Sequence, residues 1–88
     1  MSWTCELSHD AEQDLTNLPK AVQKRVARVL TQMQQDPFAG DVKILQGEAW
    51  KAVFRRRIGD YRLLFTADHA KSVVYVVRIL LRSEKTYR

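Results

Sequence analysis

Hydrophobic and polar side chains alternate along two runs of the chain that flank Gly59 and Asp60. Residues 50–58 form the first run and residues 61–65 the second, and alternation with a period of two is typical of strands. A Gly-Asp pair between two such runs predicts a tight β-hairpin. The hairpin contains five cations: Lys51, Arg55, Arg56, Arg57 and Arg62. A hairpin that carries so many cations is suited to a polyanionic partner.

The alternation divides this hairpin into two sets of side chains, one on each face of the sheet. The set that we expect to face the core is Phe54, Arg56, Ile58, Tyr61, Leu63 and Phe65. The cation-rich set on the opposite face is Lys51, Val53, Arg55, Arg57, Arg62 and Leu64. Arg56 breaks the apolar pattern, and a position near the end of the sheet would let its long side chain reach water.

Apolar residues at helical spacing predict two helices before the hairpin. Ser8 is a suitable N-cap for the first helix, which should end at Pro19. Its apolar stripe is Ala11, Leu15 and Leu18. The second helix should end at Asp36-Pro37, because the residue before a proline disfavours the helical conformation. Its apolar stripe is Val22, Val26, Val29, Leu30 and Met33, and its other faces carry Lys20, Lys24, Arg25 and Arg28.

Two more strands are predicted, one at each end of this arrangement. Residues 3–7 alternate and form the first strand, whereas residues 72–82 are dense in Val and Ile and form a central strand buried on both faces. Alternation places one set of its side chains on a single face: Val74, Val76, Arg78, Leu80 and Arg82. Residues 38–47 are expected to be a connection whose Ile44 and Leu45 lie under the sheet edge.

The order of these elements predicts an α+β fold in one domain over residues 1–88. It runs strand, two-helix hairpin and then a three-strand meander, which gives a mostly antiparallel sheet with the helices on one face. The cation-rich set is then left on the other face of the sheet.

The charge of the chain is concentrated in its second half. Residues 1–42 hold four basic and six acidic side chains, whereas residues 43–88 hold eleven basic and four acidic ones. The second half is therefore where an anionic partner is expected to bind.

Cys5 is the only cysteine, so an internal disulfide and a Cys-rich zinc site are excluded. Without a signal peptide or an apolar run of membrane-spanning length, we expect a cytoplasmic protein.

The candidate site is a group of cations with a tyrosine nearby in the polar tail: Lys51, Arg55, Arg57, Arg62, Arg78, Arg82 and Tyr87. Phosphate-binding loops, nucleophile elbows and metal-ligand clusters are absent from the sequence, so no metal or cofactor is predicted. His9 and His69 occupy positions that are ordinary for solvated polar residues. Guanidinium groups bind phosphate oxygens in pairs and stabilise additional negative charge on phosphorus. RNA cleavage fits such a site, because the 2′-hydroxyl can attack its own phosphate once it is oriented.

A simpler interpretation is that these cations only keep an exposed sheet face soluble. Like charges on neighbouring strands repel each other, which argues against that interpretation. Trp50 and Tyr61 are interpreted as aromatic residues of the core or its rim, whereas Tyr87 could stack on a base or transfer a proton.

At residues 54–65, Phe-Arg-Arg-Arg-Ile-Gly-Asp-Tyr-Arg-Leu-Leu-Phe, the sequence resembles the RelE/ParE superfamily of type II toxins. Residues 8–18 resemble the opening helix of the family, and Asp36-Pro37 its usual Asp-Pro after the second helix. Residues 43–47 resemble its Lys-x-Leu-x-Gly segment before the hairpin, and residues 82–88 its terminal Arg and Tyr. The resemblance covers nearly the whole chain and implies a RelE-like fold.

The resemblance also implies a metal-independent endonuclease of the RelE branch that cuts mRNA on the ribosome. It places catalytic roles on Arg62 and Arg82, which would stabilise the transition state, and on Arg55 and Tyr87. RNA-binding roles fall on Lys51, Arg57, Arg78, Lys85 and Arg88. The chain departs from many members at Leu81, where they have His.

The partners that the resemblance implies are a cognate antitoxin, the ribosome with its mRNA, and operator DNA only through the antitoxin complex. Two other functions remain open at this point. A ParE-like inhibitor of DNA gyrase would use the same fold, and a nucleic-acid-binding module without catalysis would use the same cations.

Overall fold

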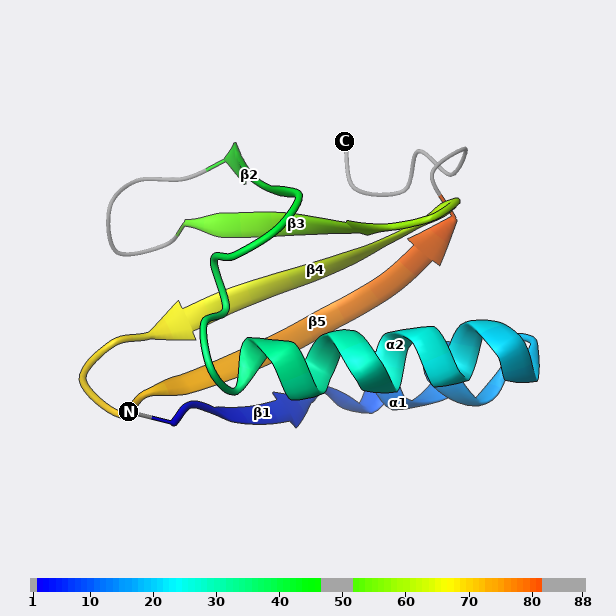
Figure 1. Ribbon diagram of the computed structural model, residues 1–88, viewed down its shortest axis with the longest axis horizontal. Coiled ribbons are helices and arrows are strands. Elements are labelled where there is room, and N and C mark those ends of the chain that lie inside the picture. Colours follow the sequence, from blue (N-terminus) through cyan, green and yellow to red (C-terminus); the bar gives the residue numbers. More distant parts are fainter. Residues whose placement is uncertain (1, 47–51, 82–88) are drawn as a thin grey trace.

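The computed structural model describes residues 2–46 and 52–81 (Figure 1). The chain begins with strand β1 (Thr4–Leu7), followed by helices α1 (His9–Thr16) and α2 (Lys20–Met33). Four strands follow: β2 (Val42–Gln46), β3 (Val53–Ile58), β4 (Tyr61–Asp68) and β5 (Val73–Leu81). They form one sheet in the order β1-β5-β4-β3-β2, in which only β1 and β5 are parallel. The predicted α+β fold is confirmed, and so is the predicted order of elements apart from the additional strand β2. β5 is an interior strand, as predicted, although β4 is the middle one.

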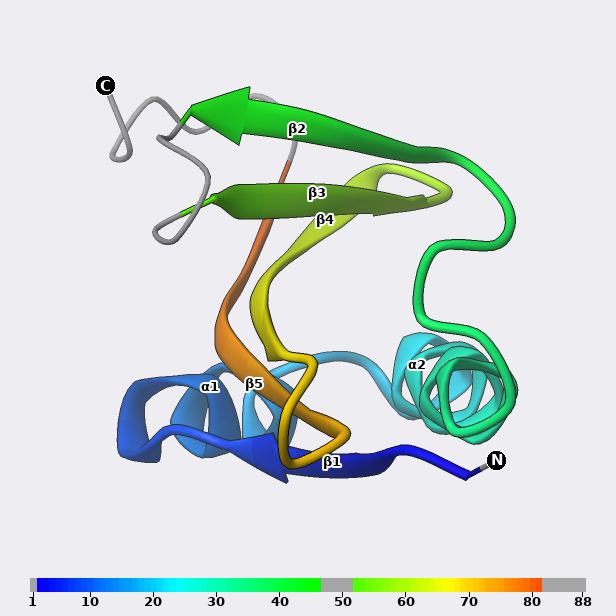
Figure 2. The same ribbon diagram turned by 90° about the vertical axis from the view of Figure 1, so that its left-hand side faces the viewer.

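One apolar core joins residues of both helices to the sheet, with α1 and α2 lying on either side of β5 in the view of Figure 2. α1 contributes Ala11, and α2 contributes Val26, Val29 and Met33. The sheet contributes Ile58, Leu63, Phe65, Val74, Val76 and Ile79. Phe65, Leu63 and Val26 are completely buried. The apolar stripe of α2 and the inward-facing residues of β4 therefore pack in the same cluster.

The prediction for residues 38–47 is wrong, because this connection contains the edge strand β2. Its Ile44 does not lie under the sheet edge, since 59% of its surface is exposed. The strand also contains a bulge: Ile44 pairs with Phe54 and Gln46 with Val53, which leaves Leu45 as an extra residue. Because Ile44 and Leu45 are adjacent and both apolar, the sequence of β2 does not alternate and gave no sign of a strand.

A second bulge corrects the predicted faces of β5. Leu64 pairs with Arg78 and Phe65 with Val76, so Val77 is the extra residue. Val74 and Val76 consequently join the core together with Ile79, and they do not share a face with Arg78 and Leu80. Tyr75 and Val77 are 37% and 39% exposed, so the prediction that β5 is buried on both faces is correct only for part of the strand.

α1 lies along the edge of β5 where β1 ends (Figure 1). The Ser8 hydroxyl accepts a hydrogen bond from the Ala11 amide at 3.0 Å and donates one to the Val77 carbonyl at 2.8 Å. One Asp14 carboxylate oxygen accepts from the Ile79 amide at 2.9 Å. The N-cap Ser8 and Asp14 of α1 thus satisfy backbone groups of β5 that a neighbouring strand would otherwise bind.

The hairpin between β3 and β4 has the short turn that the sequence predicts. Ile58 pairs with Tyr61, and Gly59 has φ +59°. A glycine with positive φ at the first central position is typical of a type II′ turn. The Arg25 guanidinium of α2 packs against Gly59 so closely that a side chain there would collide with it. Among the described residues, no helix is long and apolar enough to cross a membrane.

Candidate nucleic-acid interface

Strand pairing gathers cations on the sheet face opposite α2. In one row across the sheet Lys43 pairs with Arg55, which pairs with Leu64, which pairs with Arg78. In the next row Arg57 pairs with Arg62, which pairs with Leu80. We call this the basic sheet face: Lys43, Arg55, Arg57, Arg62 and Arg78. The structure therefore brings together Arg55, Arg57 and Arg62, as the alternation predicts.

The floor of the basic sheet face is apolar and well covered. Leu64 is 5% exposed and Leu80 is 3% exposed, and neither belongs to the core between the helices and the sheet. Arg55 lies beside Leu64 and is itself only 6% exposed. Charge interactions are stronger where water is excluded, so a phosphate placed over this floor would be bound more strongly than on an open surface.

Asp41 is the acidic neighbour of two of these arginines. Its Oδ1 lies 3.4 Å from Arg55 Nη1 and its Oδ2 lies 3.5 Å from Arg57 Nε. The Asp41 carbonyl also accepts a hydrogen bond from the Arg57 amide at 3.0 Å. The carboxylate thus supplies a counter-charge for buried Arg55 and orients the more exposed Arg57.

Arg78 is held by α1. Its Nε donates to Asp14 Oδ2 at 2.7 Å and its Nη2 donates to Asp14 Oδ1 at 3.1 Å. Burial opposes the ionisation of Asp14, but the hydrogen bonds from Arg78 and from the Ile79 amide outweigh it and hold the pKa of Asp14 below its usual value. Arg78 is therefore a cation whose position the fold defines, and part of its charge is already compensated.

Arg56 points toward the helices and takes no part in the basic sheet face. Its Nη1 donates to the Ala39 carbonyl, and its Nη2 lies 3.5 Å from Gln32 Oε1 at the end of α2. The guanidinium occupies the space beside Gly40, whose φ is +86°. This arrangement explains a cation on the core-facing side of β3.

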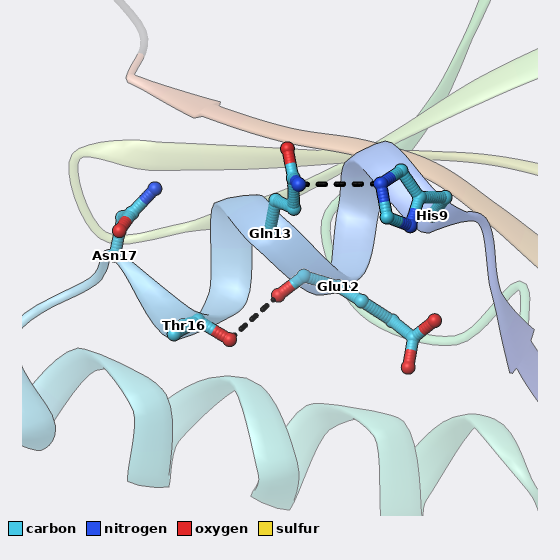
Figure 3. A pocket seen from close by; sticks show the side chains of 5 residues that line it. All are labelled: His9, Glu12, Gln13, Thr16 and Asn17. Atoms are coloured by element: carbon cyan, nitrogen blue, oxygen red, sulfur yellow. Dashed lines mark hydrogen bonds between the residues drawn. The ribbon is translucent and has the colours of Figure 1, made fainter.

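Both histidines contact a neighbouring side chain away from the basic sheet face. His9 shares a hydrogen bond of 3.2 Å with Gln13 on the rim of a shallow hollow of α1, where Glu12 is the charged neighbour (Figure 3). His69 stacks on the Phe38 ring with centroids 5.6 Å apart. Neither histidine lies on the basic sheet face.

Several predicted site residues lie outside the described residues: Lys51, Arg82, Lys85, Tyr87 and Arg88. Sequence reasoning missed three residues that shape the site. Lys43 was missed because β2 was predicted to be a connection. Asp41 and Asp14 were missed because ion-pair partners 14 to 64 residues apart leave no local pattern.

The order of elements, the mixed sheet and its cationic face define a small toxin of the RelE/ParE superfamily. Residues 5–86 match the family described as the ParE toxin of the type II toxin-antitoxin system parDE. The chain belongs to this family. None of the curated proteins matches the sequence significantly.

Solved structures of related toxins share this fold. The archaeal RelE-RelB complex from Pyrococcus horikoshii is 23% identical, with a TM-score of 0.84 over 97% of this chain and 100% of that one. The RelBE2 toxin-antitoxin complex from Mycobacterium tuberculosis is 27% identical, with a TM-score of 0.80 over 93% of this chain and 100% of that one. The YoeB/ParE toxin from Agrobacterium tumefaciens is 14% identical, with a TM-score of 0.73 over 89% of this chain and 96% of that one.

Proposed function

We propose that this toxin is a ribosome-dependent endonuclease that cleaves mRNA and so inhibits translation. The observation that carries the proposal is the placement of Lys43, Arg55, Arg57 and Arg62 on adjacent strands over a buried apolar floor. Like charges opposite each other on neighbouring strands destabilise a sheet, so an anionic ligand that separates them has a clear role. The likeness to RelE structures supports the same conclusion.

The proposed reaction is an attack of the 2′-hydroxyl on the adjacent phosphate, which releases the 5′-oxygen of the next nucleotide. Arg62 and Arg82 stabilise the additional negative charge on the phosphate, and Arg55 assists them. Tyr87 transfers a proton or stacks on a base. The phosphate backbone on either side is bound by the other basic residues that we assign to RNA: Lys43, Lys51, Arg57, Arg78, Lys85 and Arg88.

The proposed partners follow from the same surface. An acidic antitoxin segment would neutralise the toxin by covering the basic sheet face, and the solved relatives include complexes of RelE with RelB. Operator DNA would be bound only through that antitoxin. Both mRNA and ribosomes place the activity in the cytoplasm.

Arg62→Ala tests the proposal directly. We expect ribosome-dependent cuts within codons for the wild-type protein and a rate about a hundredfold lower for the variant, which is the usual effect of removing one transition-state donor. Primer extension on a defined mRNA translated in a purified system measures both. Lys71→Ala is the matched control, because it removes one exposed cation in the turn before β5. Equal cleavage by the wild-type protein and Arg62→Ala would contradict the assignment.

Inhibition of DNA gyrase is the second candidate, because the family and one solved relative carry the ParE name. Intact mRNA in every lane, together with loss of supercoiling activity when the toxin is added to purified gyrase, would favour this function over RNA cleavage.

A further inference from the structure

A second cationic surface lies on α2, far from the candidate interface. Lys20, Lys24 and Arg28 recur every four residues, so they form a row about 12 Å long on one side of the helix. All three are exposed, and we call this row the α2 basic face. Arg25 flanks it beside the Gly59 turn.

The placement of these cations is unfavourable for the helix itself. Lys20 is the first residue of α2, where the positive end of the helix dipole repels a cation. Lys20 and Lys24, and likewise Lys24 and Arg28, are like charges four residues apart, a spacing that destabilises helices. The first turn of α2 has no acidic residue, whereas that of α1 carries Asp10 and Glu12.

The α2 basic face also has no compensating partner in the described part of the chain. None of the ion pairs among residues 2–46 and 52–81 includes a cation of α2. The exposed side chains between the cations are small or polar, such as Ala27 and Thr31. No large exposed hydrophobic residue of the described chain lies on α2. Local stability therefore does not explain this surface, and charges that oppose stability are expected where a protein binds a ligand.

The α2 basic face and the basic sheet face lie on opposite sides of the molecule. α2 lies against the core face of the sheet (Figure 2) and packs its Val26, Val29 and Met33 there. Helical spacing therefore places Lys20, Lys24 and Arg28 on the side of α2 that faces away from the sheet. The shortest dimension of the molecule is 24 Å. One extended strand bound along the basic sheet face therefore cannot reach the α2 basic face without bending around the domain.

We propose that the α2 basic face binds the phosphate backbone of structured RNA in the ribosome while the basic sheet face holds the mRNA. The inference rests on the proposed function, because it takes the ribosome as the place of action. RNA fits better than a protein partner, since protein interfaces have an apolar centre and this surface has none. Interfaces with nucleic acids are polar and depend on contacts from Lys and Arg to phosphates.

The test uses the full chain and purified small ribosomal subunits without mRNA. Three versions are compared: the wild-type protein, the variant Lys20→Gln/Lys24→Gln/Arg28→Gln, and the charge-conserving variant Lys20→Arg/Lys24→Arg/Arg28→Lys. We expect the neutral variant to bind at least about tenfold more weakly, with a salt dependence whose slope is smaller by about 2 to 3. The charge-conserving variant should bind like the wild-type protein. The melting temperature of the neutral variant should be equal or higher, because unfavourable charges have been removed.

Several results would overturn the inference. They are wild-type binding by the neutral variant, absence of any affinity of the wild-type protein for the subunits, and a lowered melting temperature of the neutral variant. Stronger binding to duplex DNA or to poly-glutamate, with the same dependence on the α2 cations, would overturn the assignment to RNA.

Binding and cleavage separate this inference from the proposed function. If the wild-type protein binds subunits through the α2 basic face but primer extension shows no cuts, the inference holds and the endonuclease proposal fails. If the wild-type protein and the neutral variant cleave ribosome-bound mRNA equally and bind equally, the inference fails and the endonuclease proposal holds.

Discussion

At the scale of single residues, Asp41 is the group that most directly limits the charge of the basic sheet face. Its carboxylate lies within 3.5 Å of both Arg55 and Arg57. An incoming phosphate must therefore compete with a carboxylate that is already present. The same carboxylate keeps the two arginines oriented in the free domain.

Asp41→Asn should increase the affinity for single-stranded RNA. Removing the competing charge should strengthen binding about two- to fivefold, the range for an exposed ion pair, because the carboxylate is about half exposed. The slope of affinity against salt should become steeper by about 0.7, since one more cation is free to release counterions from a single strand. Fluorescence anisotropy with a labelled oligonucleotide across a salt series measures both quantities.

Asp10→Asn is the control for this change, because it alters the net charge equally on the exposed side of α1. If both variants bind RNA with the same small gain, the effect comes from overall charge and the role given to Asp41 is wrong.

At the scale of elements, Asp14 joins α1 to β5 through its bonds to Arg78 and to the Ile79 amide. This contact fixes the part of β5 that follows the bulge at Val77.

Asp14→Ala should destabilise the fold by about 1 to 3 kcal/mol at pH 7, because a buried amide and a guanidinium lose their acceptor. The folded-state pKa of Asp14 is lowered, so its contribution is complete above the unfolded pKa near 4 and is lost as the pH falls through the folded pKa. The difference between wild type and variant should therefore shrink at pH 3 or below. Urea unfolding at pH 7, 5 and 3 measures it, and a difference that stays constant with pH would contradict this account.

Regular elements could be predicted from the sequence, and interrupted ones could not. The spacing of Val22, Val26, Val29 and Met33 is uniformly helical, and α2 buries this stripe. The Gly59 turn was predictable because a short type II′ turn requires a residue that tolerates positive φ. β2 and the faces of β5 were mispredicted, because the extra residues Leu45 and Val77 shift the alternation by one. The arginines of the site followed from alternation, whereas their acidic partners depend on tertiary contacts.

At the scale of the whole molecule, cations occupy both outer surfaces and a single apolar core lies between them. A short free RNA can occupy only one of these surfaces. If both are needed to orient the 2′-hydroxyl for attack, free RNA lacks part of the orientation that the ribosome provides.

Cleavage of a free oligonucleotide should therefore be at least about a hundredfold slower than cleavage of the same sequence in translating ribosomes. Single-turnover rates with an end-labelled RNA, measured with and without ribosomes at the same protein concentration, test this expectation. Comparable rates in the two conditions would show that the domain alone orients its substrate.

The parallel pairing of β1 with β5 has a consequence for the time at which the toxin becomes active. Thr4 pairs with Val73 and Asp14 contacts Ile79, so the first strand and first helix have partners near the other end of the described chain. During synthesis the N-terminal residues emerge first. β1 has no strand to pair with as long as β5 is still inside the ribosome. The sheet cannot close until residue 81 has emerged. A toxin built in this order becomes folded, and therefore active, only after its last strand has left the ribosome.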